Sequence, residues 1–189
     1  MRSDDIAAQV IGHLLSENPQ VDPKEIDDLV VGNAVPEAEH GMQMGRIISL
    51  LSMPKEVPGM IVNRYCGSGL EAIAIASTRI QAGMADMIIA GGTESMSLVP
   101  ITGYKMAFNY NLADKHPDYY LNMGLTAEEV SKKWNVSREE QDQFAFTSHQ
   151  RATQALENKR FEEEIAPVTV QETYLDANAK KHQREFVVS

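Results

Sequence analysis

The chain has 189 residues, 43% of them hydrophobic, which is enough for one substantial core or for a core with a smaller subdomain. Its 27 acidic and 17 basic side chains give a formal net charge of −10, which argues against a nucleic-acid partner because such affinity depends on Lys and Arg at phosphates. A single cysteine excludes an internal disulfide, and no apolar run reaches the roughly 18 residues that span a bilayer. With an acidic N-terminal segment that lacks the apolar core of a signal peptide, the sequence predicts a cytoplasmic protein that binds neither membranes nor nucleic acids.

The first hundred residues predict helices and strands in alternation. Apolar residues recur at helical spacing in the first segment, and the run Leu29-Val30-Val31 is typical of a buried strand. In chain order the pattern predicts helix 4–16, a strand within 26–35, helix 44–51, strand 59–65, helix 67–82 and strand 86–90. This order predicts an α/β fold in which helices cover the faces of a parallel or mixed sheet.

The composition shifts near residue 100. Residues 100–121 are rich in Tyr, Asn and Asp without a clear period, which predicts a long surface loop or the entry to a subdomain. The tail alternates apolar and polar residues, which predicts a strand at 186–189. We therefore place an α/β domain at residues 1–100 and a second domain at residues 101–189.

Two helices are predicted in the second domain from capping signals. Thr126 with Glu129, and Ser137 with Glu140, have the spacing of a capping box, and each pair precedes a helical segment. The second helix is predicted over about residues 138–159. Its buried face is predicted to hold Phe144, Ala145, Ser148, Ala152 and Leu156.

The single cysteine, Cys66, is predicted to lie where a strand hands over to a helix. At a helix N-terminus the backbone dipole and the unpaired N–H groups favour the thiolate, which is the nucleophilic form. Gly67, Ser68 and Gly69 leave room for a substrate carbonyl beside the sulfur. A free cysteine is more often an inert packing residue, but this strand–Cys–Gly–Ser–Gly–helix context favours a nucleophile.

The surroundings of this cysteine resemble a known family. Residues 60–74 resemble the active-cysteine signature of the thiolases, which are acetyl-CoA acyltransferases. Residues 83–97 resemble the next strand of that family and its Gly-Gly-x-Glu-x-Met-Ser turn. Residues 123–128, 137–142 and 148–152 resemble the start of its loop domain. These motifs stand in the same order as in the family and extend the resemblance over nearly the whole chain.

The resemblance implies a thiolase-like fold, in which two similar βαβαβαββ halves pack together and a loop domain is inserted in the first. Residues 1–100 would then form one half, with a mixed sheet that lacks its first strand, and residues 101–189 part of a helical loop domain. The family's Asn-Glu-x, Gly-His-Pro and Cys-x-Gly motifs are not found here, so we expect a chain truncated relative to the full enzyme. A fragment of a longer protein and the product of a broken gene both remain open.

The resemblance also implies a reaction. Cys66 would attack the 3-keto carbonyl of a 3-oxoacyl-CoA as an acyl-thioester nucleophile, and its backbone N–H would donate to an oxyanion. Met123 matches the family methionine that lines the acyl end of the substrate pocket. Asn122 stands where short-chain enzymes commonly carry His, which favours a broader or longer range of 3-oxoacyl groups.

For partners, the resemblance implies acyl-CoA and coenzyme A as substrates, no permanently bound cofactor, a place in fatty-acid β-oxidation, and a homodimer or homotetramer of the complete enzyme. The five histidines are scattered without metal-type pairing, so no metal site is predicted. The activating His and the second Cys of the family belong to the motifs that are not found, so we expect the chain alone to be inactive. The alternative is a catalytically dead thiolase-like chain that binds acyl-CoA or pairs with a partner subunit.

Four other polar residues receive structural interpretations. Asn63 and Arg64, just before the thiol, are expected to hold the nucleophile turn by hydrogen bonds rather than to act in catalysis. Glu94, in the Gly-Gly-Thr-Glu turn, is expected to tie down neighbouring loop amides, and a role as a general base is the less favoured alternative. His40 is given no catalytic part.

Overall fold

The computed structural model describes all 189 residues and divides them into two compact units. The first unit comprises Met1–Lys105 together with Ala166–Ser189, and the second comprises Met106–Ile165. The functional domains predicted at 1–100 and 101–189 stay a prediction, because compactness by itself does not test them.

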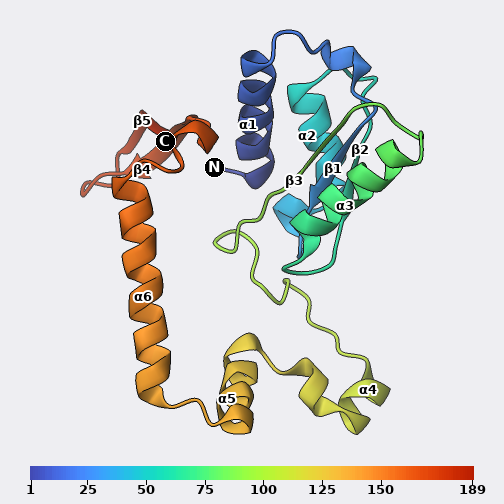
Figure 1. Ribbon diagram of the computed structural model, residues 1–189. Coiled ribbons are helices and arrows are strands. Elements are labelled where there is room, and N and C mark those ends of the chain that lie inside the picture. The colour runs from blue at the N-terminus through green and yellow to red at the C-terminus, as the bar shows by residue number, and fades with distance from the viewer. The chain divides into compact units, whose positions relative to one another are not determined.

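The first unit is built on a sheet of three parallel strands (Figure 1). They are β1 (Asp28–Gly32), β2 (Gly59–Val62) and β3 (Ile88–Gly92), in the order β2-β1-β3. All five residues of β1 are buried, as expected for a central parallel strand with helices on both faces. The predicted α/β fold with a parallel sheet is therefore confirmed. The antiparallel pairing lies apart, in a hairpin of β4 (Val168–Leu175) and β5 (Lys181–Val188), which contains most of the strand predicted at 186–189.

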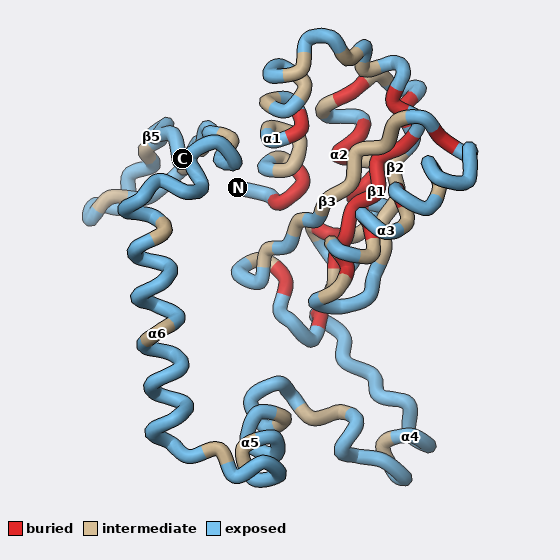
Figure 2. The backbone as a smooth tube through the Cα atoms, in the orientation of Figure 1, coloured by how far each residue is buried: buried red, intermediate tan, exposed pale blue.

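Three helices accompany this sheet, and their ends agree with the predictions to within one or two residues. They are α1 (Ser3–Glu17), α2 (Met44–Ser52) and α3 (Ser68–Gln81), with short 3-10 turns η1 (Pro23–Glu25) and η2 (Ala38–His40). The core lies between α1, α2 and the sheet, where Figure 2 shows the buried segments gathered. Its buried members are Ile11, Ile26, Leu29, Val31, Met44, Ile48, Met53 and Val57. Burial of each large side chain contributes about 1.5–3 kcal/mol.

Two carboxylates, those of Asp4 and Asp27, form hydrogen bonds at the ends of elements in this unit. Burial by itself would raise the pKa of Asp4, but hydrogen bonds from the Arg2 guanidinium outweigh it and hold that pKa below its usual value. Asp27, just before β1, accepts the backbone N–H groups of Asp86 and Met87 at 2.7 and 3.0 Å. These bonds fix the start of β3 beside the start of β1.

The second unit is helical. It contains α4 (Tyr110–Lys115), η3 (Pro117–Tyr120), α5 (Met123–Trp134), α6 (Arg138–Glu157) and η4 (Glu162–Glu164). The segment predicted as a long loop at 100–121 thus carries a short helix, capped by the Asn109 side chain on the N–H of Leu112. No helix of the chain combines the length and the apolar character needed to cross a membrane.

Two predictions for the second unit are wrong. The face of α6 predicted to be buried is exposed, with Phe144 79% and Leu156 65% accessible, because no element of this unit covers it (Figure 2). Thr126 does not cap α5. It lies inside that helix, because Asn122 already caps it by accepting the N–H of Leu125 at 2.9 Å.

The partner predicted for Thr126 is engaged elsewhere, since the Glu129 carboxylate pairs with Lys132 at 2.7 Å. The other predicted capping box is confirmed. Ser137 Oγ accepts the N–H of Glu140, and the Glu140 carboxylate accepts the N–H of Ser137 at 2.8 Å. Hydrogen bonds from Ser137 lower the pKa of Glu140.

Candidate functional site

Cys66 lies at the junction that the sequence predicts. β2 ends at Val62, Gly67 is the N-cap residue of α3, and the thiol is exposed to solvent. The strand ends three residues earlier than predicted, and the five residues 63–67 connect β2 to α3. The cysteine therefore sits at the carboxyl edge of the parallel sheet, where ligands of open α/β sheets commonly bind.

Ser68 closes this turn with its buried side chain. Its Oγ accepts the N–H of Arg64 at 2.9 Å and donates to the carbonyl oxygen of Tyr65 at 2.6 Å. The N–H of Gly67 donates to the carbonyl oxygen of Arg64 at 3.0 Å. The residues before and after Cys66 in the chain thus have backbone groups that are held by hydrogen bonds.

The residues before the thiol have the structural roles predicted for them. Asn63 Oδ1 accepts the N–H of Tyr65 at 2.9 Å, and the Arg64 guanidinium pairs with Glu71 of α3 at 2.8 Å. Tyr65 has φ of +46°, a left-handed conformation that residues with a Cβ rarely adopt, so the turn is held in shape by its hydrogen bonds. This conformation points the chain from the end of β2 into α3.

The polar atoms of Cys66 itself have no partner within the chain. The N–H groups of Tyr65, Gly67 and Ser68 each have an acceptor in the turn, whereas that of Cys66 has none. No side chain forms a hydrogen bond with Cys66 Sγ. The sulfur and an adjacent N–H donor are both available to a ligand, but this chain places no base on the thiol.

The loops that follow β1 and β3 lie against the turn, because the carboxyl ends of parallel strands share one edge. Asn63 Nδ2 donates to the carbonyl oxygen of Ala34 at 2.9 Å. The N–H of Ala34 donates to Glu94 Oε2 at 2.6 Å, and Asn33 Nδ2 donates to the carbonyl oxygen of Thr93 at 2.9 Å. The prediction that Glu94 ties down loop amides is confirmed.

His40 completes this set of loops from a fully buried position. Its Nδ1 lies 3.0 Å from Glu94 Oε1 and 3.1 Å from the carbonyl oxygen of Val35, and its Nε2 accepts the N–H of Ser95 at 3.2 Å. These contacts assign the ring proton to Nδ1 and leave Nε2 as an acceptor. Both ring nitrogens are engaged, so His40 cannot serve as a base for a ligand at Cys66.

The end of β1 also presses on the start of α3. A Cβ added to Gly32 would lie 2.4 Å from the carbonyl carbon of Ser68 and 2.5 Å from the N of Gly69. Only glycine allows the two backbones to approach so closely. The first turn of α3 is therefore packed directly on the central strand.

Met123, the second predicted site residue, belongs to the second unit. It is the first residue of α5, is 66% exposed, and lines a hollow of about 810 Å³ between α5 and α6. Val130, Trp134 and Phe144 supply most of the apolar surface of this hollow. Cys66 and Met123 therefore belong to different units.

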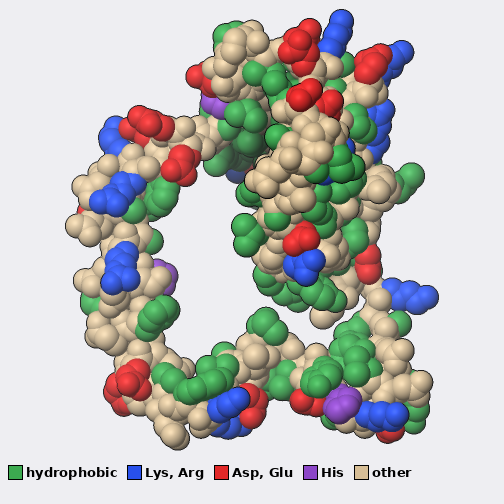
Figure 3. Space-filling view, turned by 45° about the vertical axis from the view of Figure 1, so that its right-hand side comes forward, with side chains coloured by type: hydrophobic (Ala, Val, Ile, Leu, Met, Phe, Trp, Pro, Cys, Tyr) green, Lys and Arg blue, Asp and Glu red, His purple; other side chains and the backbone are tan.

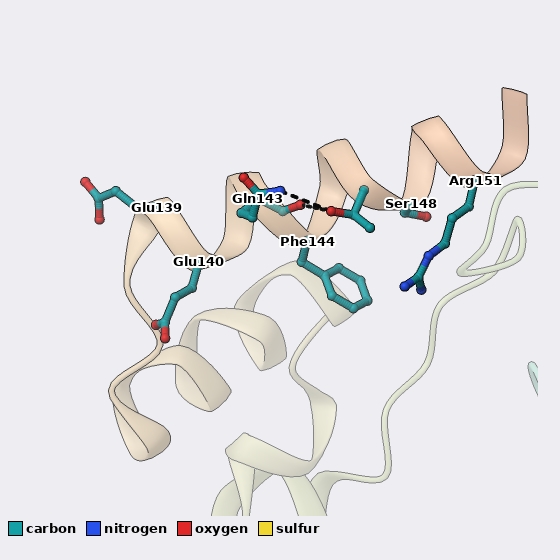
Figure 4. Close-up of a pocket in the computed structure, with 7 residues that line it drawn as sticks. Glu139, Glu140, Gln143, Phe144, Ser148 and Arg151 are labelled. Atoms are coloured by element: carbon teal, nitrogen blue, oxygen red, sulfur yellow. Dashed lines mark hydrogen bonds between the residues drawn. The ribbon is translucent and has the colours of Figure 1, made fainter. Parts of the chain in front are cut away.

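A second hollow runs along α6 and is shown in Figure 4. Its lining residues include Glu140, Phe144 and Arg151. The dashed lines mark hydrogen bonds between Gln143 and Thr147, at 3.1 Å from the Gln143 amide to the Thr147 hydroxyl and at 2.9 Å from that hydroxyl to the backbone carbonyl oxygen of Gln143. One helix supplies every lining side chain, so nothing encloses a ligand there. No group of three His, Cys, Asp or Glu side chains in the 189 residues is arranged to hold a metal ion.

Two residues at the junction have roles that the sequence does not predict. Ser68 is expected only to leave space beside the thiol, yet its hydroxyl ties the turn together. A serine at the first turn of a helix often bonds nearby backbone groups, so its position is a usable signal. His40 carries no such signal, because its partners Glu94 and Ser95 are far away along the chain.

Comparison with known proteins relates this geometry to a family. The family model for the N-terminal domain of thiolases matches residues 1–186. The whole chain is 46% identical to the 3-ketoacyl-CoA thiolase of Bacillus subtilis (strain 168), of which it covers 48%. It is 40% identical to the beta-ketoadipyl-CoA thiolase of Acinetobacter baylyi, over 90% of this chain and 47% of that protein. A probable acetyl-CoA acyltransferase of Staphylococcus epidermidis is also 40% identical, over 88% of this chain and 45% of that protein.

The chain thus spans about half the length of the relatives it matches. The matched family domain covers both units, including the Cys66 junction and the hollow that Met123 lines. On these matches, the chain belongs to the thiolase family and corresponds to its N-terminal domain.

Proposed function

We propose that Cys66 is the acyl-carrying nucleophile of an enzyme that cleaves 3-oxoacyl-CoA with coenzyme A. The observation that carries this proposal is an exposed cysteine between β2 and α3 in a chain of the thiolase family. A helix N-terminus favours the thiolate, and the free N–H of Cys66 can donate a hydrogen bond to a neighbouring oxygen that carries negative charge.

The proposed reaction has two halves. In the first, the Cys66 thiolate attacks the 3-keto carbon, the C2–C3 bond breaks, and acetyl-CoA leaves as an enolate that takes a proton from an acid. In the second, the thiolate of coenzyme A attacks the acyl group, the bond from that group to Cys66 Sγ breaks, and the shortened acyl-CoA is released with Cys66 as a thiolate. Coenzyme A acts as a substrate, and no resident cofactor is invoked.

The substrates proposed are 3-oxoacyl-CoA with a broader or longer range of acyl groups than acetoacetyl-CoA, in fatty-acid β-oxidation in the cytoplasm. The support comes from the name of the Bacillus subtilis relative, 3-ketoacyl-CoA thiolase, and from the apolar hollow that begins at Met123. Asn122 caps α5 with its side chain, which leaves no histidine at that position to contact a short acyl group.

We also propose that the first unit works only when a second α/β half covers it. Apolar residues of α3 and of the turn that follows it are exposed at spacings of three, seven and four: Leu70 at 74%, Ile73 at 53%, Ile80 at 41% and Met84 at 70%. Figure 3 shows apolar side chains at the surface of this unit. An exposed apolar face of this kind indicates a site where another protein surface packs. A homodimer or homotetramer of the complete enzyme is the assembly proposed.

One observation favours the alternative, a thiolase-like chain that binds acyl-CoA or a partner subunit without turning over. Cys66 Sγ has no hydrogen-bonding side chain in this chain, so nothing here holds it deprotonated or supplies a proton to the enolate. General acid–base assistance is worth about 10²–10⁴ in rate, and an oxyanion donor about 10²–10³ more. The 189-residue chain alone is therefore proposed to be inactive.

The test adds the half of the Bacillus subtilis relative that this chain does not cover. Thiolysis is followed by the loss of magnesium–enolate absorbance of acetoacetyl-CoA and of a longer 3-oxoacyl-CoA. We expect no turnover from the chain alone, turnover after the C-terminal half of the Bacillus subtilis relative is added, and none after Cys66→Ala. Ser16→Ala, at the far end of α1, is the matched control and retains activity.

Three outcomes separate the possibilities. Turnover by the chain alone that disappears in Cys66→Ala would show that the chain carries its own base. Turnover by the two halves that survives Cys66→Ala would overturn the choice of nucleophile. Binding of acyl-CoA by the assembled halves without turnover would support the alternative function.

A further inference from the structure

We propose that Glu94 and His40 form a positioning pair that sets the conformation of the Cys66 turn. The proposal rests on the proposed function of Cys66 as a nucleophile. The pair acts through the backbone of Ala34 and the side chain of Asn63, and neither member touches a substrate. They are positioning residues rather than catalytic ones.

The contacts form a continuous path from the buried imidazole to the residue before the thiol. His40 Nδ1 lies 3.0 Å from Glu94 Oε1, and Glu94 Oε2 accepts the N–H of Ala34 at 2.6 Å. The other side of that residue continues the path, since the carbonyl oxygen of Ala34 accepts from Asn63 Nδ2 at 2.9 Å. Asn63 Oδ1 then accepts the N–H of Tyr65 at 2.9 Å.

Each group on this path has one protonation pattern that satisfies all its neighbours. Glu94 faces two donors, the N–H of Ala34 and Nδ1–H of His40, and an ionised carboxylate accepts at both oxygens. The Nε2 of His40 must accept, because the N–H of Ser95 points at it. An amide in place of the Glu94 carboxylate would turn an NH₂ group toward one of its two donors.

The burial of the pair makes such a mismatch costly. The His40 side chain is fully buried, and that of Glu94 is 31% exposed. A buried polar group without a hydrogen-bonding partner lowers the stability of the folded protein, because water cannot reach it to replace the lost bond. The loop from Asn33 to Val35 would therefore shift to find new partners, and the Asn63 amide would follow the carbonyl oxygen it binds.

The path ends where a small shift matters most for the thiol. Tyr65 is held at φ of +46°, a conformation that costs energy and persists only while its neighbours enforce it. Loss of the bond from its N–H to Asn63 would let the turn relax. Cys66 would then lose its fixed place beside the first turn of α3, together with the help that the helix gives to the thiolate.

The test measures the alkylation rate of Cys66 by neutral iodoacetamide in the full 189-residue chain, alongside the urea midpoint of each variant. Cys66 is the only cysteine, so the label reports on one site. We expect Glu94→Gln and Asn63→Ala to slow alkylation by about two- to fivefold, the range that a helix N-terminus contributes. Because both act on one path, the double variant should be no slower than the slower single variant.

Two His40 variants and one control make the test specific. His40→Gln places one donor and one acceptor at a spacing close to that of the imidazole nitrogens, so it should react like the unsubstituted chain. His40→Leu fills the space without either group and should react as slowly as Glu94→Gln. Asp27→Asn alters a carboxylate of the same kind that binds Asp86 and Met87 at the opposite end of the strands, and it should leave the rate unchanged.

The two proposals fail in different ways. If the unsubstituted chain reacts no faster than the same chain unfolded in urea, Cys66 is not activated and the proposed function loses its support. If the unsubstituted chain reacts fast and Glu94→Gln and His40→Leu react equally fast while folded, only the positioning role is overturned. Slowing by His40→Gln equal to that by His40→Leu would also overturn it, because shape rather than hydrogen bonding would then be what matters.

Discussion

The hydroxyl of Ser68 donates a 2.6 Å hydrogen bond to the carbonyl oxygen of Tyr65, and the two residues between them are Cys66 and Gly67. The hydroxyl oxygen of Ser68 also accepts the N–H of Arg64 at 2.9 Å. One buried side chain thus bonds two backbone groups of the turn, the N–H of Arg64 and the carbonyl oxygen of Tyr65. The shape of the turn that carries Cys66 therefore depends on this serine.

Ser68→Ala is expected to destabilise the first unit. It removes the acceptor of the Arg64 N–H and one of the two donors to the Tyr65 carbonyl oxygen, at a cost of about 1–3 kcal/mol. Urea denaturation followed by circular dichroism measures this as a lower midpoint with an unchanged slope. Ser77→Ala, on an exposed position of the same helix, should change stability by less than about 0.5 kcal/mol. Equal effects from both serines would show that helix propensity, not the turn, is responsible.

Gly32→Ala should be among the most damaging single-methyl changes in the chain. The added Cβ would lie 2.4 Å from the backbone of Ser68, so strand or helix must move, at about 1–3 kcal/mol or more. Gly12→Ala is the matched control, because nothing lies within 4 Å of its added Cβ on the exposed side of α1. A helical Gly→Ala change there should stabilise the chain by up to about 1 kcal/mol. Thermal unfolding of the two variants should therefore shift in opposite directions.

Asp27 predicts a pH dependence of stability. Hydrogen bonds from the backbone N–H groups of Met87 and Asp86 lower the pKa of the Asp27 carboxyl group in the folded chain. In the unfolded chain its pKa is about 3.9. The carboxylate therefore contributes stability that is present above about pH 4 and is lost as the pH falls through the lower pKa of the folded state. The stability difference between the unsubstituted chain and Asp27→Asn should shrink below pH 4. A difference that stays constant from pH 7 to pH 3 would contradict this.

Much of the first unit could be predicted because its signals are local. The run Leu29-Val30-Val31, the helical spacing in α1 and the small residues after Cys66 each reflect the element in which they lie. The exposure of Phe144 and Leu156 could not be predicted in this way. Their spacing marks an apolar face, but whether anything covers that face depends on residues elsewhere.

The network around the thiol was predictable only in part. Asn63 and Glu94 stand next to recognisable motifs and have the structural roles expected of them. Their common partner Ala34 has a side chain with no polar group, and it contributes only through its backbone, which no residue pattern reports. Thr126 shows the opposite error, because a capping signal is present but Asn122 starts the helix earlier with a stronger local bond.

The exposed apolar face of α3 predicts that the chain associates with itself. The isolated chain should associate in solution, because Leu70 and Ile73 lie side by side on that face, 74% and 53% exposed, and association removes their surface from water. Leu70→Lys combined with Ile73→Lys should shift the light-scattering mass toward that of a monomer. Leu50→Lys combined with Leu51→Lys adds the same charge to exposed positions of α2 and should leave the mass unchanged. A cooperatively melting monomer of the unsubstituted chain would show that α3 needs no cover, and it would remove the support for a second half packed on this face.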